Sequence, residues 1–297
     1  MRALELAEIT PDEKVPGMAI PWSRLLLCRV LRSPGARLGL TLLGMMIVLS
    51  VLAPLIARYP PDAIDVSIIN QGPSGAHWFG TDDIGRDMWS RTLFGGRVSL
   101  PAGLGVVAIA LGLGAPLGLI AGYAGGMLDD VIMRAMDVLL SFPGVVLAIG
   151  VVSILGTGLR SAVIAVGIAS LPGYARLARA SALSVREQEY VVAARTVGAG
   201  HTRILFRHIL VNVADPLIVF ATLNLGGAIL VTAALSFLGI GTQLPTPDWG
   251  TMLSEGYTHM FQARSEVTFP GLAIVLTVLG INLLGDGLAG ALNPRLD

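Results

Sequence analysis

Residues 98–128 read VSLPAGLGVVAIALGLGAPLGLIAGYAGGML and contain no Asp, Glu, Lys or Arg. A helix needs about 20 mainly apolar residues to cross about 30 Å of hydrocarbon, so this stretch is long enough to span a membrane. Five further runs also lack those four residue types: 38–57, 138–159, 161–175, 216–247 and 267–285. The shortest, 161–175, reaches spanning length if the side chains at its ends snorkel to the interface.

The composition excludes several classes of protein. The 297-residue chain is 54% hydrophobic and 13% charged, whereas soluble domains average about 25% charged residues. A soluble globule is therefore excluded, and so is disorder, which requires low hydrophobicity. Residues 146–156, VLAIGVVSILG, are apolar on every side and do not alternate as barrel strands do. We therefore expect an all-α integral membrane protein with six transmembrane helices.

The placement of arginine predicts the orientation, because positive charge collects in short cytoplasmic loops. Residues 16–37 and 176–207 are rich in arginine, whereas 58–97 carries five Asp against four Arg and 248–266 is net acidic. Six spans with both termini in the cytoplasm satisfy all four segments. The expected spans are 37–57, 99–122, 131–155, 160–182, 210–235 and 268–290. The expected divisions are a cytoplasmic segment over 1–36, a six-span domain over 37–297, an extracytoplasmic loop over 58–98 and a cytoplasmic loop over 183–209.

The cytoplasmic loop carries the most informative pattern. Residues 185–212 read VREQEYVVAARTVGAGHTRILFRHILVN, which predicts a short amphipathic helix, a turn at Gly198 and Gly200, and a second helix leading into the fifth span. Tyr190, Ala193, Ala194 and Val197 share one face at spacings of three and four. Such a helix either lies on the lipid headgroups or docks a cytoplasmic partner, and the periodicity alone leaves both open.

This stretch resembles the cytoplasmic loop of binding-protein-dependent ABC importer permeases. That loop has Glu-Ala-Ala, a Gly four residues later, and then Ile, His and Leu-Pro. Two positions depart from the pattern, because Val192 replaces the Glu and Val211 replaces the Pro, while Glu189 lies one turn earlier. The positions that the resemblance assigns to the loop are Glu189, Tyr190, Val192, Ala193, Ala194, Gly198, Ala199, Gly200, Ile204 and His208.

Three further stretches are similar to the dipeptide, oligopeptide and nickel permeases of this family, especially the second permease subunit of dipeptide systems. They are 77–100, which precedes the second span, 235–253, and the last span with its flank over 270–296. The first stretch carries the extracytoplasmic motif residues Gly80, Thr81, Asp82, Gly85, Arg86, Asp87 and Arg91. The resemblance covers nearly the whole chain, from about Leu25 to Leu296.

The resemblance implies a type I ABC importer permease fold, called MetI-like, in a bacterial inner membrane. It implies a heterodimer with a homologous six-span subunit, two ABC ATPase subunits and an extracytoplasmic peptide-binding protein, with no nucleic-acid partner. The loop would be the coupling helix that transmits ATPase closure to the spans. The chain has no G-x-x-x-x-G-K-[ST] motif, so we expect no cofactor in it, with ATP and Mg bound by the ATPase subunits.

The expected function is import of dipeptides or oligopeptides, with nickel chelates or glutathione-like peptides as alternative substrates. Two other classes are disfavoured. A membrane enzyme lacks support, because neither H-E-x-x-H nor G-x-S-x-G occurs in the sequence. A self-sufficient secondary transporter is expected to show inverted repeats, and no duplicated half is visible.

Other residues admit more than one interpretation. Gly114, Gly118 and Gly122 form a small-residue stripe, which favours close packing within the subunit over a subunit interface. The charges of 77–97 suggest an ion-pair network that holds the loop, with a docking surface for the binding protein as the alternative. Asn224 and Asn282 either bond between helices or line the transport path. Within 129–137, acid–arginine spacings of three and four predict ion pairs along one helix.

Overall fold

The computed structural model describes residues 30–261 and 263–292, so most of the expected N-terminal segment over 1–36 lies outside the described residues. The described residues form helices and loops, with one isolated antiparallel bridge between Thr81 and Asp87. The first half contains α2 (Pro34–Val51), α3 (Ala53–Ile56), the 3-10 turn η1 (Val66–Ile68), α4 (Met88–Ile109), the π-helical turn η2 (Ala110–Gly114), α5 (Ala115–Ala124), α6 (Gly126–Leu140) and α7 (Gly144–Leu155). The second half contains α8 (Leu159–Arg186), α9 (Glu189–Thr196), α10 (His201–Ile204), the π-helical turn η3 (Leu205–Ile209), α11 (Leu210–Phe237), α12 (Trp249–Tyr257) and α13 (Arg264–Leu292).

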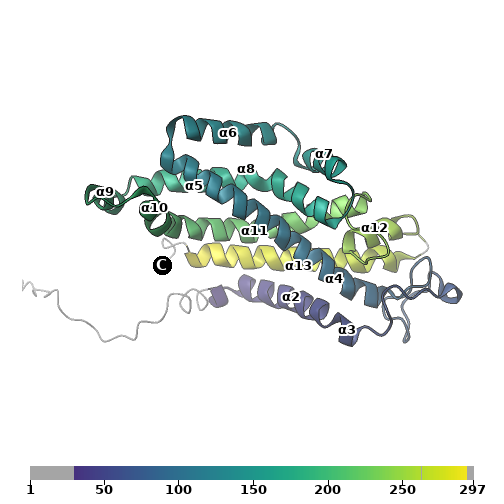
Figure 1. Ribbon diagram of the computed structural model, residues 1–297. Helices are drawn as coiled ribbons and strands as arrows, with labels where there is room; N and C mark the ends of the chain where they lie inside the picture. The colour runs from purple at the N-terminus through teal and green to yellow at the C-terminus, as the bar shows by residue number, and fades with distance from the viewer. Residues whose placement is uncertain (1–29, 262, 293–297) are drawn as a thin grey trace, which may run out of the picture.

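Long apolar helices run side by side along the molecule (Figure 1). Five continuous helical stretches among the described residues are long and apolar enough to cross a membrane: 34–51, 88–124, 159–186, 201–237 and 264–292. Each overlaps one expected span. The helices begin where local signals place them: the side chain of Ser33 caps α2 ahead of Pro34 at the first helical position, and the Asp87 carboxylate accepts from the Ser90 backbone N–H at the start of α4.

The expected span over 131–155 is not one continuous helix in the structure. α6 and α7 replace it, and their axes are bent by 93° across residues 141–143. Pro143 explains the break, because its ring and missing N–H do not fit a continuing helix and Phe142 before it is pushed toward extended backbone. The pair makes a sixth span only if the bent helices are taken together. In Figure 1, α6 lies along the upper edge of the molecule, and α7 packs against α8, where Ala148 and Val152 share an apolar cluster with Ala162 and Ala165.

Small residues allow the helices to approach closely. A Cβ added to Gly118 would overlap the backbone of Ala175 on α8, and one added to Gly122 would lie 2.6 Å from the carbonyl oxygen of Arg179. The glycine stripe of α5 therefore packs against α8 of the same chain. α2 lies on α13 in the same way, where Gly39 faces the carbonyl of Gly280. This packing forms a scaffold that presents loops at both ends of the bundle.

Candidate functional site

The segment over 187–204, here called the α9 loop, projects beyond one end of the long helices (Figure 1). α9 follows the end of α8, and a tight turn at Gly198 leads into α10. Gly198 has φ +84°, a backbone conformation that glycine adopts without the penalty a Cβ would bring. The predicted order of helix, glycine turn and second helix is therefore present in the structure.

Two buried side chains fix the α9 loop to the bundle. Val191 is fully buried and Ile204 is 1% exposed, and both belong to the apolar cluster that contains Leu119 and Ala182. The guanidinium of Arg186 also donates to the carbonyl oxygen of Gly122 over 2.9 Å. Ile204 was assigned to the partner-facing loop by resemblance, but its side chain points into the bundle and acts as an anchor.

The remaining apolar side chains of α9 face outward. Tyr190, Val192 and Val197 are 45%, 49% and 86% exposed. Ala193 and Gly200 are exposed as well, and Ala194 and Ala199 are half-buried. The expected apolar face is thus largely uncovered by this chain, and Glu189 lies exposed beside it. His208 is half-buried in the following helix, where its ring lies 6.3 Å from that of Tyr190.

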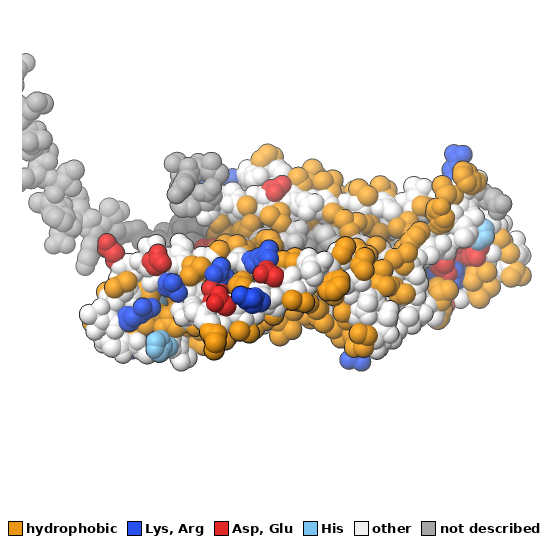
Figure 2. Space-filling model, turned by 90° about the horizontal axis from the view of Figure 1, so that it is seen from above, with side chains coloured by type: hydrophobic (Ala, Val, Ile, Leu, Met, Phe, Trp, Pro, Cys, Tyr) orange, Lys and Arg blue, Asp and Glu red, His pale blue; other side chains and the backbone are white. Residues whose placement is uncertain are grey.

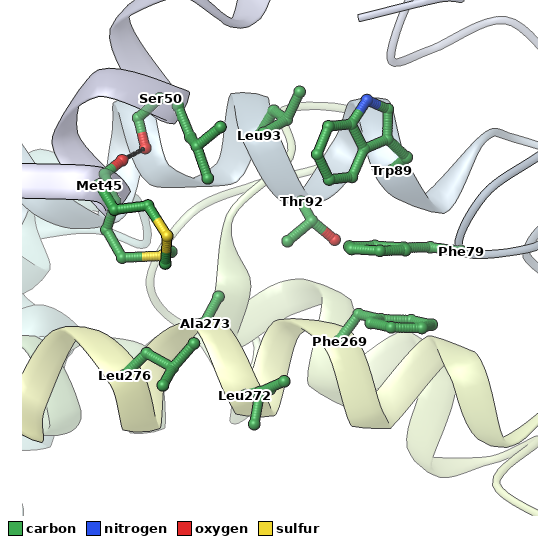
Figure 3. Close-up of a pocket in the computed structure, with 12 residues that line it drawn as sticks. Met45, Ser50, Phe79, Trp89, Thr92, Leu93, Phe269, Leu272, Ala273 and Leu276 are labelled. Atoms are coloured by element: carbon green, nitrogen blue, oxygen red, sulfur yellow. Dashed lines mark hydrogen bonds between the residues drawn. The ribbon is translucent and has the colours of Figure 1, made fainter. Parts of the chain in front are cut away.

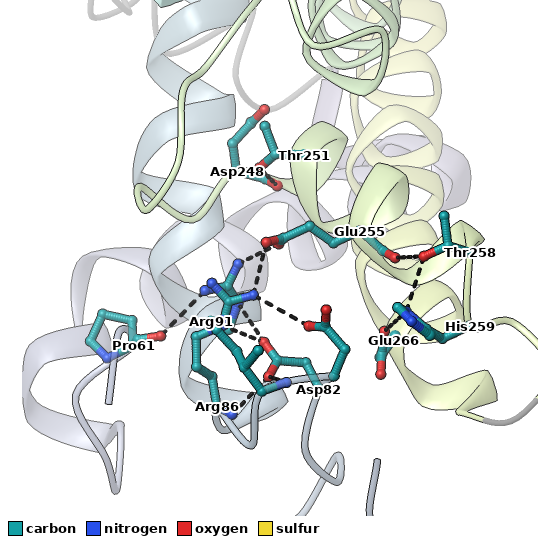
Figure 4. A network of polar contacts seen from close by, with 12 residues as sticks. Pro61, Asp82, Arg86, Arg91, Asp248, Thr251, Glu255, Thr258, His259 and Glu266 are labelled. Carbon is teal, nitrogen blue, oxygen red and sulfur yellow. Dashed lines mark hydrogen bonds and ion pairs between the residues drawn. The ribbon is translucent and has the colours of Figure 1, made fainter. Parts of the chain in front are cut away.

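A compact charge network occupies the opposite end of the molecule (Figure 4). We define the charge network as Asp82, Arg86, Arg91 and Glu255. Arg86 contacts Asp82 through Nε over 2.5 Å and Glu255 through Nη2 over 2.8 Å. Arg91 donates to the other oxygen of Glu255 over 2.6 Å. Burial opposes the charge on Arg86, but its contacts with Glu255 and Asp82 outweigh this effect, and the pKa of the guanidinium is raised.

The other motif residues of this end are also buried and engaged. Asp87 holds the ring of His77, whose Nδ1 lies 2.9 Å from Oδ1 of the carboxylate. Thr81 donates to the carbonyl of Ile68. Gly80 and Gly85 have φ +78° and +82°. All seven predicted motif residues are buried, which agrees with the structural interpretation and leaves no exposed charge among them for a binding protein.

Sequence reasoning missed Glu255, the residue that completes the charge network. Glu255 lies on α12, 169 positions after Arg86. The sequence showed that residues 248–266, which include Glu255, are net acidic, but it did not single out Glu255 as a site residue. A local signal does exist, because a single acid next to apolar residues suggests that the acid has a buried partner. No spacing rule identifies Arg86 and Arg91 as the partners of Glu255.

The ion pairs of α6 also differ from the expected pattern. Both oxygens of Asp129 accept from Arg179 on α8, over 2.5 and 2.6 Å, and Asp137 contacts Arg176 on the same helix over 2.5 Å. The predicted pairs along α6 are thus replaced by pairs across two helices. Figure 2 shows the molecule from above, so that α6 faces the viewer. On this face the charged side chains gather at the end of the molecule that carries α9.

Among the span cavities, one of about 160 Å³ lies between α2, α4 and α13 (Figure 3). Its walls include Met45, Trp89 and the stacked rings of Phe79 and Phe269, with centroids 3.7 Å apart. Its two hydroxyl groups, on Ser50 and Thr92, donate to carbonyls of their own helices. The cavity therefore suits an apolar occupant such as a lipid chain and offers little to a charged solute.

The two asparagines predicted for the path lie on different helices. Asn224 is exposed on α11, and its amide donates to the Phe220 carbonyl over 2.8 Å. Asn282 is exposed on α13, close to Gly226 of α11. Asn224 lines a second cavity, between α4, α8 and α11.

Comparison with known proteins identifies the family. The model described as the binding-protein-dependent transport system inner membrane component matches residues 114–297. The chain belongs to this family. A model described as the N-terminal transmembrane domain of oligopeptide transport permease C matches residues 21–73. The importer permease predicted from the cytoplasmic loop is therefore confirmed, as a multi-pass inner-membrane component.

Relatives in this permease family are similar along most of the chain. The dipeptide transport system permease protein DppC of Alkalihalophilus pseudofirmus is 46% identical over 261 residues, which cover 88% of this chain and 86% of the relative. The glutathione transport system permease protein GsiD of Pectobacterium atrosepticum is 46% identical over 258 residues, 85% and 86% of the two chains. The probable D,D-dipeptide permease DdpC of Escherichia coli K12 is 43% identical over 263 residues, 89% and 88% of the two chains.

The fold matches a solved permease. A chain of the inward-facing MetNI methionine ABC transporter superposes with a TM-score of 0.58 at 18% identity, covering 69% of this chain and 98% of that chain. This likeness confirms the predicted MetI-like fold of an ABC importer permease.

Proposed function

We propose that this permease imports dipeptides or short oligopeptides and that the α9 loop couples it to cytoplasmic ATPase subunits. The observation that carries the coupling role is the exposed apolar face that Tyr190 and Val197 share, in a loop that the buried side chain of Val191 fixes to the bundle. Exposed apolar side chains on a fixed helix are the kind of surface that a partner covers. A helix anchored in this way moves as a body with the spans to which it is attached.

The proposed assembly contains a homologous six-span permease, two ABC ATPase subunits and an extracytoplasmic peptide-binding protein. ATP and Mg would bind to the ATPase subunits. The proposed orientation places α9 in the cytoplasm and the charge network outside, because arginine predominates at the α9 end. Alternating access at the interface of the two permeases would then follow closure of the ATPase subunits.

Peptide import is supported by the relatives named for dipeptides and D,D-dipeptides. Glutathione-like peptides form a second candidate substrate class, because a relative of equal identity is named for glutathione. Both classes are short peptides with ionised groups. Nickel chelates receive no comparable support, since these three relatives are named for dipeptides, glutathione and D,D-dipeptides.

The test is purification of the tagged chain from its native membrane, followed by identification of partners by mass spectrometry. We expect a sibling permease and two ABC ATPase subunits, and we expect ATP-dependent peptide uptake after reconstitution with the binding protein. Recovery of the chain alone as a stable homo-oligomer would contradict the proposed assembly. Uptake of nickel chelates but not of peptides would contradict the proposed substrate.

The coupling role has a matched pair of variants. Val197→Glu places a charge on the proposed docking face, whereas Val66→Glu does the same at a 72% exposed valine of the loop at the opposite end. Neither site is buried, so we expect both proteins to insert and fold. Val197→Glu should lower copurification of the ATPase subunits and peptide uptake at least about tenfold, because a loss of about 1.4 kcal/mol in binding is tenfold. Equal uptake by both variants would exclude α9 as the coupling element.

A further inference from the structure

A cavity of about 200 Å³ lies where α4, η2, α8 and α11 meet, and it differs in chemistry from the apolar cavity of Figure 3. Most of its wall is formed by valine, alanine and glycine. Three polar side chains also contribute to it: Ser170 and Tyr174 from α8, and Asn224 from α11. An engineered cavity of about 150 Å³ holds benzene, so this space accommodates one planar peptide unit.

Tyr174 is held rigidly with an unsatisfied hydroxyl. The residue is 1% exposed, and its Oη has no hydrogen-bond partner among the described residues. Phe220 packs edge-on against its ring at a centroid distance of 4.9 Å. Gly114, in the π-helical turn, leaves room for it, since a Cβ there would lie 3.0 Å from that of Tyr174. A buried phenol normally finds a partner, and none of the described residues supplies one to Tyr174.

The other two polar groups supply acceptors. Ser170 donates its hydrogen to the carbonyl of Val166 over 2.8 Å and keeps lone pairs on its oxygen. Asn224 uses one amide hydrogen on the carbonyl of Phe220, which leaves its amide oxygen able to accept. The cavity therefore combines one O–H donor with acceptors, as required to bind a C=O and an N–H together.

The position of Asn224 indicates what the cavity faces. Asn224 lies midway along α11 and is exposed, and Gly227, one turn on, has no atom near its Cβ position. An amide at this depth is costly against lipid. This side of α11 therefore borders a polar path or a partner subunit, and the cavity opens beside it.

We propose that this cavity binds the main chain of the peptide in transit: Tyr174 Oη donates to a carbonyl or carboxylate oxygen, and Asn224 Oδ1 accepts from an amide N–H. The inference rests on the proposed function and deepens it, because main-chain recognition would admit peptides of different sequence while their side chains remain outside the cavity. No covalent bond is made or broken. The peptide's hydrogen bonds to Tyr174 and Asn224 are lost when the path reopens and the peptide leaves the cavity.

The test uses the complete importer in proteoliposomes with the peptide-loaded binding protein. Tyr174→Phe and Asn224→Leu should each lower the maximal rate of dipeptide uptake about tenfold, the value of one lost hydrogen bond, while the complex still assembles. The matched control is Thr277→Val, which removes a hydroxyl on α13 that is equally buried and unpartnered but does not line this cavity. Control uptake should equal that of the wild type.

A second measurement separates binding from a structural role. A dipeptide and its ester analogue, which lacks the N–H, are compared in the same assay with the same binding protein. Asn224→Leu should reduce the wild-type preference for the amide, whereas Thr277→Val should retain it. An unchanged preference together with unchanged uptake in both cavity variants would overturn the inference. Loss of the assembled complex in Tyr174→Phe would overturn it too, in favour of a contact with the partner permease.

Failure of the inference is distinguishable from failure of the proposed function. If the wild-type importer takes up no peptide, the proposed substrate is wrong. If the wild type imports peptide and Tyr174→Phe imports it equally well, only the role of the cavity is wrong.

Discussion

The charge network and the α9 loop lie at opposite ends of this permease and differ in how their side chains are paired and buried. In the charge network, each arginine contacts both acids, and all four groups come from segments packed against one another. In the α9 loop, Val191 and Ile204 are buried, but the large apolar side chains between them stay exposed. The four members of the charge network are paired with one another, whereas the outward-facing apolar side chains of α9 have no partner among the described residues.

From this difference we infer that the charge network maintains the fold, whereas the exposed side chains of α9 are available to a partner. Buried, mutually bonded charges are costly to disturb, because removing one member leaves another charge without a partner. Exposed side chains on an anchored helix cost little to change. We therefore expect substitutions at the charge network to affect stability and substitutions on the outer face of α9 to affect assembly.

The largest expected effect follows removal of an arginine from the charge network. Arg91→Ala leaves Glu255 without one of its two guanidinium partners and Asp82 with a weakened one. Breaking a buried pair costs about 3–5 kcal/mol, so the free energy of unfolding in detergent should fall by that order. Thermal unfolding followed by size-exclusion chromatography measures it. A fall no larger than that of Val197→Glu would contradict the assigned difference between the two ends.

Two glycines sharpen the comparison, because both have positive φ but different surroundings. A Cβ at Gly85 would overlap the carbonyl of Asp65, whereas a Cβ at Gly198 meets no atom within 4 Å. Gly198→Ala should cost only the backbone penalty of about 1–2 kcal/mol. Gly85→Ala should cost about 1–3 kcal/mol more, because the neighbouring backbone must move. Chemical denaturation of the two variants measures the difference in their free energies of unfolding. Equal losses of stability would show that the backbone at Asp65 moves easily to accommodate the added methyl group.

The anchor of the α9 loop is expected to have an intermediate effect. Val191→Ala removes two methyl groups from a fully buried site, which corresponds to a loss of about 2 kcal/mol including the cavity left behind. Protease digestion of the loop should accelerate accordingly, since local opening becomes easier. Val192→Ala, on the exposed side of the same helix, is the control and should digest at the wild-type rate.

The smallest expected effect concerns a hydrogen bond at the surface. Tyr123 Oη lies 2.8 Å from Nδ1 of His201 and links the end of α5 to α10. Tyr123→Phe should cost about 0.5–1.5 kcal/mol at most, because water replaces the lost partner at an exposed site. Peptide uptake should therefore stay close to that of the wild type. A loss as large as that of Val191→Ala would mean that the loop depends on this bond for its position.

Much of the fold was predictable from local sequence. Apolar runs located the five continuous spanning stretches, and glycine at 198 located the turn after α9. The bend between α6 and α7 was not predicted, because a proline by itself does not locate a break. Pro101, Pro172, Pro216 and Pro270 lie inside continuous helices, whereas the helical stretch is interrupted at Pro143. The apolar face of α9 was also predicted from the spacing of its residues. That spacing could not show which side of the helix packs against the bundle.

The sequence by itself determined the class of protein, the number of apolar segments and the family, because these depend on composition and on motifs within a few residues. Only the tertiary structure decided which groups meet. It joined Glu255 to Arg86 and Arg91, replaced pairs along α6 by pairs to α8, and placed Tyr174 beside Asn224. The physical reason is range: hydropathy, capping and backbone preference act over one or two helical turns, whereas burial and pairing depend on helices brought together from distant parts of the chain.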